Sequence, residues 1–290
     1  MNLTFGLGIS TSAAPGADPV AQAKHAEEMN FDFVSASDHP CGTHPSHETW
    51  TMLTWVAAST SRIGIASRVL GVPYRPPAMV AKMAQTLDLL SGGRLILGLG
   101  GGYSDDEFRA FGLGVPSPSE KVAGLADAIT IARGLWTSDA FTFVGKRYHT
   151  DGATIEPKPA RPIPIWLGTF GDRALEVTGR LADGWIPSHS YMPDDQVPAM
   201  RDRIFAAAVD AGRDPHEITL AYNLEVRVDA AAAPDSSLFT GPADAIVERL
   251  LPFVDMGFTV FNFLTSGDRE TEQVELLASE VIPPLRSAVS

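Results

Sequence analysis

Length, composition and charge restrict the class of protein before any motif is considered. The 290 residues, 44% of them hydrophobic, can bury the core of one large domain or of two smaller ones. The formal net charge of −13, from 35 acidic and 22 basic residues, disfavours binding to nucleic acid or to an anionic membrane. Neither a signal peptide nor an apolar run of the roughly 20 residues needed to span a bilayer is visible. Cys41 is the single cysteine, which excludes an internal disulfide and fits the cytoplasm.

Short strand-like runs alternate with longer helical patterns from one end of the chain to the other. Expected strands span residues 3–9, 31–35, 63–70, 94–99, 163–168, 184–187, 218–228 and 259–264. Expected helices span residues 19–30, 47–60, 77–90, 119–136, 172–182, 194–211, 242–256 and 269–286. Eight βα units predict a parallel sheet flanked by helices, and eight strands are the number that closes a barrel.

A doubly wound sheet is the structural rival to a barrel. It would place a Gly-x-Gly-x-x-Gly turn directly after the first strand, and residues 10–15 contain no such turn. The sequence therefore predicts an α/β protein with one (β/α)8 TIM barrel over residues 1–290 and a short insertion before strand five. This insertion, residues 137–162, reads as a hairpin and a proline-rich extended segment. Residues 229–240 read as a mobile surface loop.

The active site of such a barrel forms at the carboxyl ends of its strands, and this rule selects a few short segments. They are residues 37–39, 67–69, 98–103, 168–173, 187–189 and 265–266. The glycines of 98–102 let backbone approach a ligand, and the amides of a following helix favour an anion. A simple tight turn explains the same glycines equally well.

Asp38 and His39 are the first candidates for proton transfer. At a strand end both can reach the mouth of the barrel, and a histidine titrates near neutrality. The alternative is that Asp38 caps a turn while His39 is merely solvated. Glu107 instead fits a capping box, in which Ser104 is the N-cap and Glu107 reaches back to its N–H, so we assign it a structural role.

The loop of residues 38–47 also gathers possible metal ligands, namely His39, His44 and His47. They lie in a single loop rather than on spaced, rigid elements, so a zinc site is disfavoured. We expect no metal. The sequence has neither a P-loop nor a Gly-x-Ser-x-Gly nucleophile elbow.

Six motifs give the whole chain a resemblance to a known family. They are 73–78 (PYRPPA), 87–94 (LDLLSGGR), 98–102 (GLGGG), 164–168 (PIWLG), 182–185 (ADGW) and 240–244 (TGPAD). In order and spacing these motifs resemble the luciferase-like monooxygenase superfamily, particularly its branch that uses coenzyme F420, a deazaflavin.

The resemblance implies a barrel with the cofactor bound at the strand ends, against a non-proline cis peptide at Arg68–Val69 or one residue earlier. It also implies that the cofactor phosphate lies on the loop after strand five, where backbone amides, the helix dipole and Arg173 attract an anion. The cofactor-binding residues expected on this basis are Asp38, Ser67, Arg68, Val69, Gly101, Gly102, Gly168, Thr169, Phe170, Gly171 and Arg173.

Deazaflavin-type relatives place an Asp-His pair at the end of strand two, which matches Asp38 and His39, whereas the FMN monooxygenases more often have Glu-His-His. We therefore expect an oxidoreductase that transfers a hydride between coenzyme F420 and a small organic substrate. His39 would donate or accept the accompanying proton, and Asp38 would contact the cofactor or orient His39. Tyr103 and His189 would face the substrate. Tyr103 stands where some sugar-phosphate-oxidising relatives have a glutamate, which argues against a sugar phosphate.

Other functions stay open at this point. The chain could be an FMN-dependent monooxygenase fed by a partner reductase, a metal-dependent barrel hydrolase using His39, His44 and His47, or a barrel that binds cofactor without turnover. Neither nucleic acid nor membrane is an expected partner. Dimers are usual in the family, so we expect a homodimer.

Overall fold

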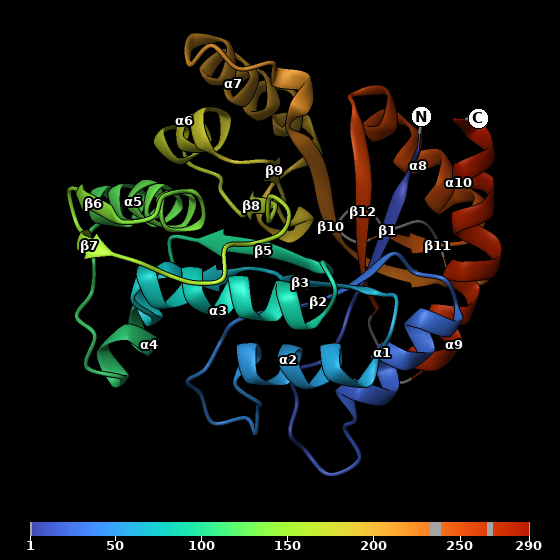
Figure 1. Cartoon of the computed structure of the whole chain (residues 1–290). Helices are drawn as coiled ribbons and strands as arrows, with labels where there is room; N and C mark the ends of the chain where they lie inside the picture. The colour runs from blue at the N-terminus through green and yellow to red at the C-terminus, as the bar shows by residue number, and fades with distance from the viewer. Residues whose placement is uncertain (1, 233–238, 266–268, 290) are drawn as a thin grey trace.

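The computed structural model describes residues 2–232, 239–265 and 269–289. Eight parallel strands form a closed ring in it, each pairing with the next along the chain (Figure 1). They are β1 (Thr4–Gly8), β2 (Phe33–Ala36), β3 (Gly64–Ser67), β5 (Leu95–Gly100), β8 (Ile165–Leu167), β9 (Gly184–Trp185), β10 (Thr219–Val228) and β12 (Phe258–Thr265). All eight match expected strands, and the predicted (β/α)8 barrel is confirmed.

Helices cover the outside of the ring (Figure 1). They are α1 (Pro19–Glu28), α2 (Thr49–Ser59), α3 (Pro77–Leu90), α4 (Asp105–Ala110), α5 (Pro118–Thr137), α6 (Asp172–Leu181), α7 (Val197–Asp210), α8 (Ala243–Asp255), α9 (Glu270–Leu276) and α10 (Ile282–Ala288). A π-helical turn, η5 (Leu277–Val281), joins the last two, and 3-10 turns lie at η1 (Val72–Tyr74), η2 (His189–Tyr191), η3 (Asp194–Gln196) and η4 (Pro215–Glu217).

The helix starts follow from local chemistry. At α1 the Asp18 side chain accepts hydrogen bonds from two backbone amides, and Pro19 occupies the first helical position. At α5 a complete capping box forms between Ser117 and Glu120. These caps explain why helix starts could be placed closely from sequence.

The insertion before the fifth barrel strand is a hairpin, as predicted. Its strands β6 (Phe141–Val144) and β7 (His149–Ala153) pair antiparallel and lie beside α5 (Figure 1). The Asp127 carboxylate of α5 holds the turn, because it accepts from the amides of Arg147 at 2.7 Å and Tyr148 at 3.0 Å.

The prediction of a surface loop over 229–240 was wrong at its end. Residues 239 and 240 belong to β11 (Phe239–Gly241), which pairs in parallel with β10 and buries Phe239. This pairing satisfies backbone groups that a loop would leave to solvent. Residues 233–238 of the same prediction lie outside the described residues. The remaining short strand, β4 (Leu70–Gly71), continues the third barrel strand and pairs with β5.

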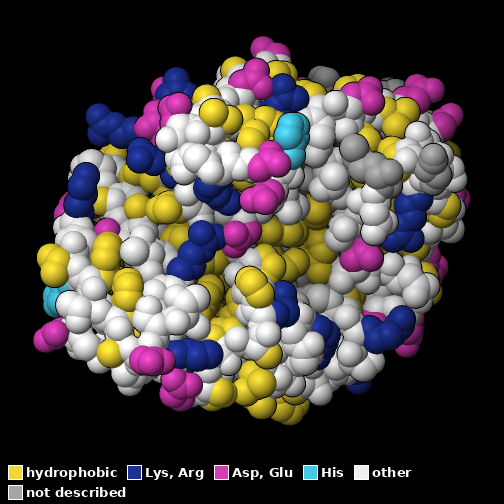
Figure 2. Space-filling view, turned by 45° about the horizontal axis from the view of Figure 1, so that its top comes forward, with side chains coloured by type: hydrophobic (Ala, Val, Ile, Leu, Met, Phe, Trp, Pro, Cys, Tyr) yellow, Lys and Arg dark blue, Asp and Glu magenta, His cyan; other side chains and the backbone are white. Residues whose placement is uncertain are grey.

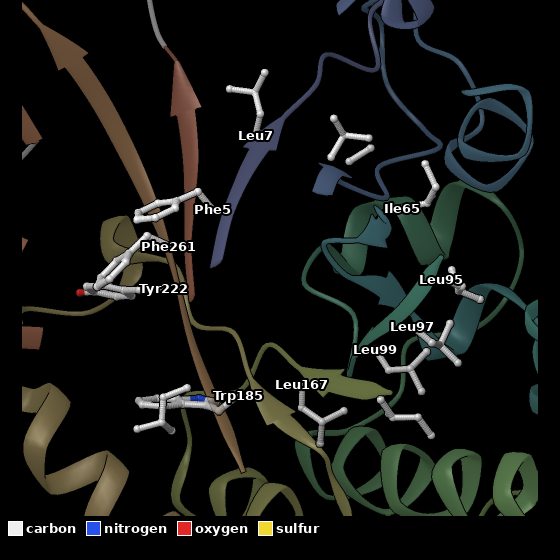
Figure 3. Packing of buried hydrophobic residues seen from close by; sticks show 14 of the residues in the cluster. Phe5, Leu7, Ile65, Leu95, Leu97, Leu99, Leu167, Trp185, Tyr222 and Phe261 are labelled. Atoms are coloured by element: carbon white, nitrogen blue, oxygen red, sulfur yellow. The ribbon is translucent and has the colours of Figure 1, made fainter. Parts of the chain in front are cut away.

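The large hydrophobic core lies between the ring and its helices. Figure 3 shows its labelled side chains, such as Phe5, Leu97 and Trp185, on the outer side of the strands. Burial of each such side chain contributes about 1.5–3 kcal/mol before the cost of ordering.

The inside of the barrel has its own small core. Phe33 and Trp166 meet edge to face with ring centroids 5.9 Å apart, and smaller residues complete the layer. Gly6 and Gly184 are required opposite them, since a Cβ at either position would collide with one of these rings. This layer of side chains fills the barrel below the carboxyl ends of its strands.

A ladder of buried polar side chains lies in the same barrel. Ser35 donates to Asn262 at 3.0 Å, and Asn262 donates to Asn223 at 2.8 Å. Asn223 in turn donates to the Ser188 hydroxyl at 3.3 Å. Polar groups here are satisfied by one another, and Asn223 also faces the cavity described below.

Among the described residues, no helix is long and apolar enough to cross a membrane. On the face shown in Figure 2, acidic and basic side chains lie interspersed rather than segregated into fields of one sign.

Candidate active site

A cavity of about 450 Å³ opens at the carboxyl ends of the barrel strands, within the range of roughly 300–1,000 Å³ that is usual for small-molecule sites. Its lining is Ser37, Asp38, His39, Arg68, Val69, Gly71, Tyr74, Gly100, Gly101, Gly102, Tyr103, Gly168, Phe170, Ile186, Ser188, Tyr191 and Asn223. Asp38, residues 68–69, residues 100–102, and Gly168 with Phe170 lie far apart in sequence and meet around this cavity.

One wall of the cavity is the backbone after β3. The peptide bond between Arg68 and Val69 is cis, at the position that the resemblance implies. Ser67 is buried and exchanges hydrogen bonds with Gly98, donating to its carbonyl and accepting from its amide, both at 2.9 Å. A Cβ on Gly98 would collide with the Ser67 carbonyl, and one on Gly100 would press on Val69. These two glycines therefore allow the close approach of β5 to the bend.

Asp38 is buried and held entirely by protein groups. Its carboxylate accepts from both terminal nitrogens of Arg75, at 2.8 and 3.0 Å, and from the Gly71 amide at 3.1 Å. Burial acts to lower the pKa of Arg75, but hydrogen bonds and charge from Asp38 and Glu48 outweigh it and raise that pKa above its usual value. Asp38 thus fixes the start of η1 under the cavity, and no described contact joins it to His39.

Glu107 takes the place beside His39 that Asp38 was expected to fill. Glu107 Oε1 lies 2.9 Å from His39 Nδ1, and its Oε2 accepts from the Tyr74 hydroxyl at 2.6 Å. The capping-box prediction was therefore half wrong: Ser104 caps α4 by accepting from the Glu107 amide, but the Glu107 side chain turns into the site instead of back to Ser104.

Tyr74 completes this cluster as a hydrogen-bond donor. Burial raises the pKa of its hydroxyl above the usual value, and the hydrogen bond to Glu107 and the charges of Glu107 and Asp38 add to the shift. The Tyr74 ring also packs on Phe108, with centroids 4.9 Å apart. The hydroxyl therefore stays protonated and keeps donating to Glu107 over the physiological pH range.

The loop after β8 divides its residues between the cavity and the core. Gly168 and Phe170 line the cavity, whereas Thr169 is buried and bonds the Thr178 hydroxyl at 2.7 Å. Gly171 is the N-cap of α6 and supplies no capping side chain. A helix start without a side-chain cap can offer amides to an anion.

Arg173 lies apart from the cavity. It is exposed and lines a separate hollow of about 670 Å³ between α5, α6 and the β6–β7 hairpin. The structure does not bring Arg173 together with the other expected cofactor residues around the 450 Å³ cavity.

Of the two residues expected to face the substrate, Tyr103 is in the cavity lining and His189 is not. His189 is buried behind the strands between Phe239 and Tyr222, and its Nε2 lies 3.1 Å from Asp194. Burial acts to raise the pKa of Asp194, yet hydrogen bonds from His189 and Arg249 lower it below the usual value. Ser188, the preceding residue, faces the cavity instead.

His44 and His47 are exposed on the loop after β2. Among the described residues, no three His, Cys, Asp or Glu side chains converge as a metal site would require.

The match to a family model covers most of the chain. Residues 2–247 match the model of the luciferase-like monooxygenases. The chain belongs to this family.

Curated relatives of similar length lie within it. The chain is 33% identical to an F420-dependent glucose-6-phosphate dehydrogenase of Kineococcus radiotolerans, over 97% of each protein. It is 28% identical to the enzyme of the same name from Nakamurella multipartita, over 99% of this chain and 98% of the relative.

Solved structures repeat the fold. An F420-dependent secondary alcohol dehydrogenase in complex with an F420–acetone adduct superposes with a TM-score of 0.87 at 20% identity, over 98% of this chain and 99% of the other. A coenzyme F420-dependent tetrahydromethanopterin reductase from Methanopyrus kandleri superposes with a TM-score of 0.82 at 19% identity, over 98% and 100%.

Proposed function

We propose that this chain is an F420-dependent oxidoreductase that transfers a hydride between the deazaflavin and a small organic substrate. The observation that carries the proposal is the convergence of four distant segments on one strand-end cavity, in a chain whose full-length relatives bear the name of F420-dependent dehydrogenases. Fold alone would not support it, because unrelated activities share the barrel.

The residues around the cavity fit a flat ring with an anionic tail. The backbone at Arg68–Val69 and the glycines 100–102 offer a surface without bulky side chains, where a ring can lie close to the main chain. Gly168 and the start of α6 would hold the phosphate, with backbone amides and the helix dipole in place of a cluster of cations.

When bound, coenzyme F420 would supply a two-electron carrier that exchanges hydride. The protein supplies orientation and the proton. With Glu107 accepting from Nδ1–H of His39, the neutral tautomer carries its lone pair on Nε2, which becomes the atom that takes or gives a proton. Asp38 and Arg75 keep the backbone beneath His39 in place.

A titration with two cofactors tests the cofactor assignment. F420 and FMN, each added to the same apoprotein, would be followed by the change in their fluorescence. We expect saturable binding of F420 at least tenfold tighter than that of FMN, which is a difference of about 1.4 kcal/mol. Tighter binding of FMN, or binding of neither, would contradict the proposal.

A pair of histidine variants tests the chemical role. His39→Ala should keep F420 binding but slow hydride transfer about 10²- to 10⁴-fold, as loss of a general acid or base does. His44→Ala, an exposed histidine five residues along the same loop, is the matched control and should keep the wild-type rate. Rates would be measured under anaerobic conditions on a panel of alcohols and conjugated carbonyl compounds. An unchanged rate for His39→Ala would remove this role.

We also propose a cytoplasmic homodimer. The single cysteine supports a reducing compartment, and the family resemblance supports the dimer. Light scattering during size-exclusion chromatography would check the oligomeric state, and a monomer at micromolar concentration would refute the dimer.

A further inference from the structure

Arg68 differs from the other charged groups of the cavity. Arg75 is fully engaged by Asp38 and Glu48. The Arg68 side chain has no hydrogen bond or ion pair to any described residue, and its Nε is buried without a partner. Arg68 as a whole is half-buried, and polar atoms buried without a partner are rare, so its unpartnered Nε indicates a missing anionic or acceptor ligand.

Its charge persists at physiological pH. Burial lowers the pKa of the Arg68 guanidinium to about 10, and the negative charge of Glu225 offsets part of that effect. A pKa of about 10 leaves the group protonated near pH 7. The cavity therefore contains a permanent cation that the described protein groups do not neutralise by direct contact.

The guanidinium points away from the loop expected to hold the cofactor phosphate. A Cβ on Gly8 would lie 3.7 Å from Arg68 Nη2, so the side chain reaches the end of β1. In the order of the ring, β1 is separated from β8 by β2, β3 and β5, whereas the phosphate loop follows β8 directly. An anion bound by Arg68 would therefore be distinct from the cofactor phosphate.

Three aromatic side chains stand at the rim of the same cavity. Tyr103 and Tyr191 are 75% and 59% exposed, with ring centroids 5.6 Å apart, and Phe170 lies 5.9 Å from Tyr191. They come from three separate loops, after β5, β8 and β9. Large aromatic rings exposed together on a soluble protein commonly mark a contact surface, and aromatic faces favour other flat rings.

We propose that the substrate is a small aromatic or conjugated carboxylate, with its carboxylate on Arg68 and its flat part against Tyr103, Phe170 and Tyr191. This rests on the proposed function, since it names the substrate class of that site. Arginine can bind a carboxylate through two parallel hydrogen bonds. Asn223 and Ser188, which line the same cavity, add polar groups to its wall.

Calorimetric titration with benzoate and its neutral counterpart benzamide tests the charge. Both the apoprotein and the F420-loaded protein would be titrated. We expect benzoate to bind at least tenfold tighter than benzamide, a preference that falls to less than twofold in Arg68→Met and is partly kept in Arg68→Lys. Tyr191→Ala should weaken the binding of both ligands by the same factor, because the contact between the rings does not depend on the charge of the substituent.

The outcomes separate this inference from the function it rests on. Equal affinity of wild type for the two ligands, no saturable benzoate binding in the millimolar range, or a preference that survives in Arg68→Met would overturn it. Preference for benzoate in a protein that fails to bind F420 would refute the cofactor and leave the carboxylate site standing. If Arg68→Met fails to fold, the wild-type comparison and Arg68→Lys still decide.

Discussion

At the scale of single residues, the proposed proton transfer would depend on three side chains from three elements. His39 follows β2, Tyr74 ends η1 and Glu107 lies in α4. Glu107 joins the other two, with contacts of 2.9 Å to His39 and 2.6 Å to Tyr74. A carboxylate in this position orients the imidazole and sets its tautomer, so Glu107 acts as a positioning residue toward His39.

Glu107→Gln tests that positioning role. We expect hydride transfer to slow about 10- to 100-fold, because the imidazole loses its orientation. The F420 dissociation constant should change by less than about threefold, because the cofactor site stays intact. Glu107→Asp should recover part of the rate. Asp106→Asn, the exposed neighbour paired with Arg109, is the control and should behave as wild type. Rate and affinity falling together in Glu107→Gln would indicate a merely structural role.

Sequence reasoning proposed His39 as the proton-transfer residue but missed its hydrogen-bond partner Glu107, for a physical reason. Glu107 is 68 residues away from His39, and its local pattern fits a helix cap equally well. Only the folded barrel shows which of two possible donors, the Ser104 amide or the His39 ring, is the partner of the Glu107 carboxylate. The assignment of His189 failed similarly, since the strand-end rule gives the right end of the barrel but not which neighbouring residue faces inward. Ser188 faces inward there.

At the scale of elements, the motif over residues 87–94 joins the ends of two helices through its last residue, Arg94. Arg94 donates to the Ala57, Thr60 and Ile63 carbonyls at the end of α2 and to the Ser91 carbonyl at the end of α3. The unpaired carbonyls of two helix ends are thereby satisfied by one side chain. This explains why a motif that indicates the family lies outside the cavity.

Arg94→Met should therefore destabilise the fold without touching the site. Several carbonyls lose a charged donor, and we expect a loss of about 3 kcal/mol in the free energy of unfolding, measured by urea denaturation. Arg180→Met, which removes an exposed arginine near the end of α6, should change it by less than about 0.5 kcal/mol. If Arg94→Met lowers the free energy of unfolding no more than Arg180→Met does, Arg94 does not have this stabilising role.

Most elements could be predicted because their signals are local. Alternation of strand-like runs with helical stretches predicted the eight strands, and the pattern of residues 137–162 predicted the hairpin. β11 could not be predicted, since its short sequence becomes a strand only by pairing with β10 and burying Phe239. Tertiary pairing outweighs the local turn signal there.

At the scale of the whole molecule, stability at acid pH depends in part on Asp194, which joins η3 to His189 and to Arg249 of α8. Its pKa is lower in the folded chain than in the unfolded one. The stabilisation is therefore fully present above the unfolded pKa, about 3.9, and is lost as pH falls through the folded pKa.

Asp194→Asn should accordingly lower the free energy of unfolding at pH 7 by about 1–2 kcal/mol, a value reduced for the partial exposure of the carboxylate. The difference from wild type should shrink as pH falls through the folded pKa of Asp194, because the carboxyl is then neutral like the asparagine. Denaturation at a series of pH values measures it. A difference that grows on acidification would contradict the assigned direction.

Closure of the barrel is what assembles the site. Residue 100 ends β5, and residues 38, 68 and 168 follow the ends of β2, β3 and β8. These four strands are successive in the ring, although 130 residues of sequence separate the first of these positions from the last. The parallel arrangement brings all their carboxyl ends to one face. The cavity is thus a property of the whole fold and of the small residues that let its segments approach.

Hydrogen–deuterium exchange with and without F420 measures this convergence most directly. The account predicts slower exchange on cofactor binding in four segments together, residues 37–39, 68–71, 100–103 and 168–172, and unchanged exchange in the β6–β7 hairpin. Protection confined to the hairpin and its neighbouring hollow, or to only one of the four segments, would contradict it.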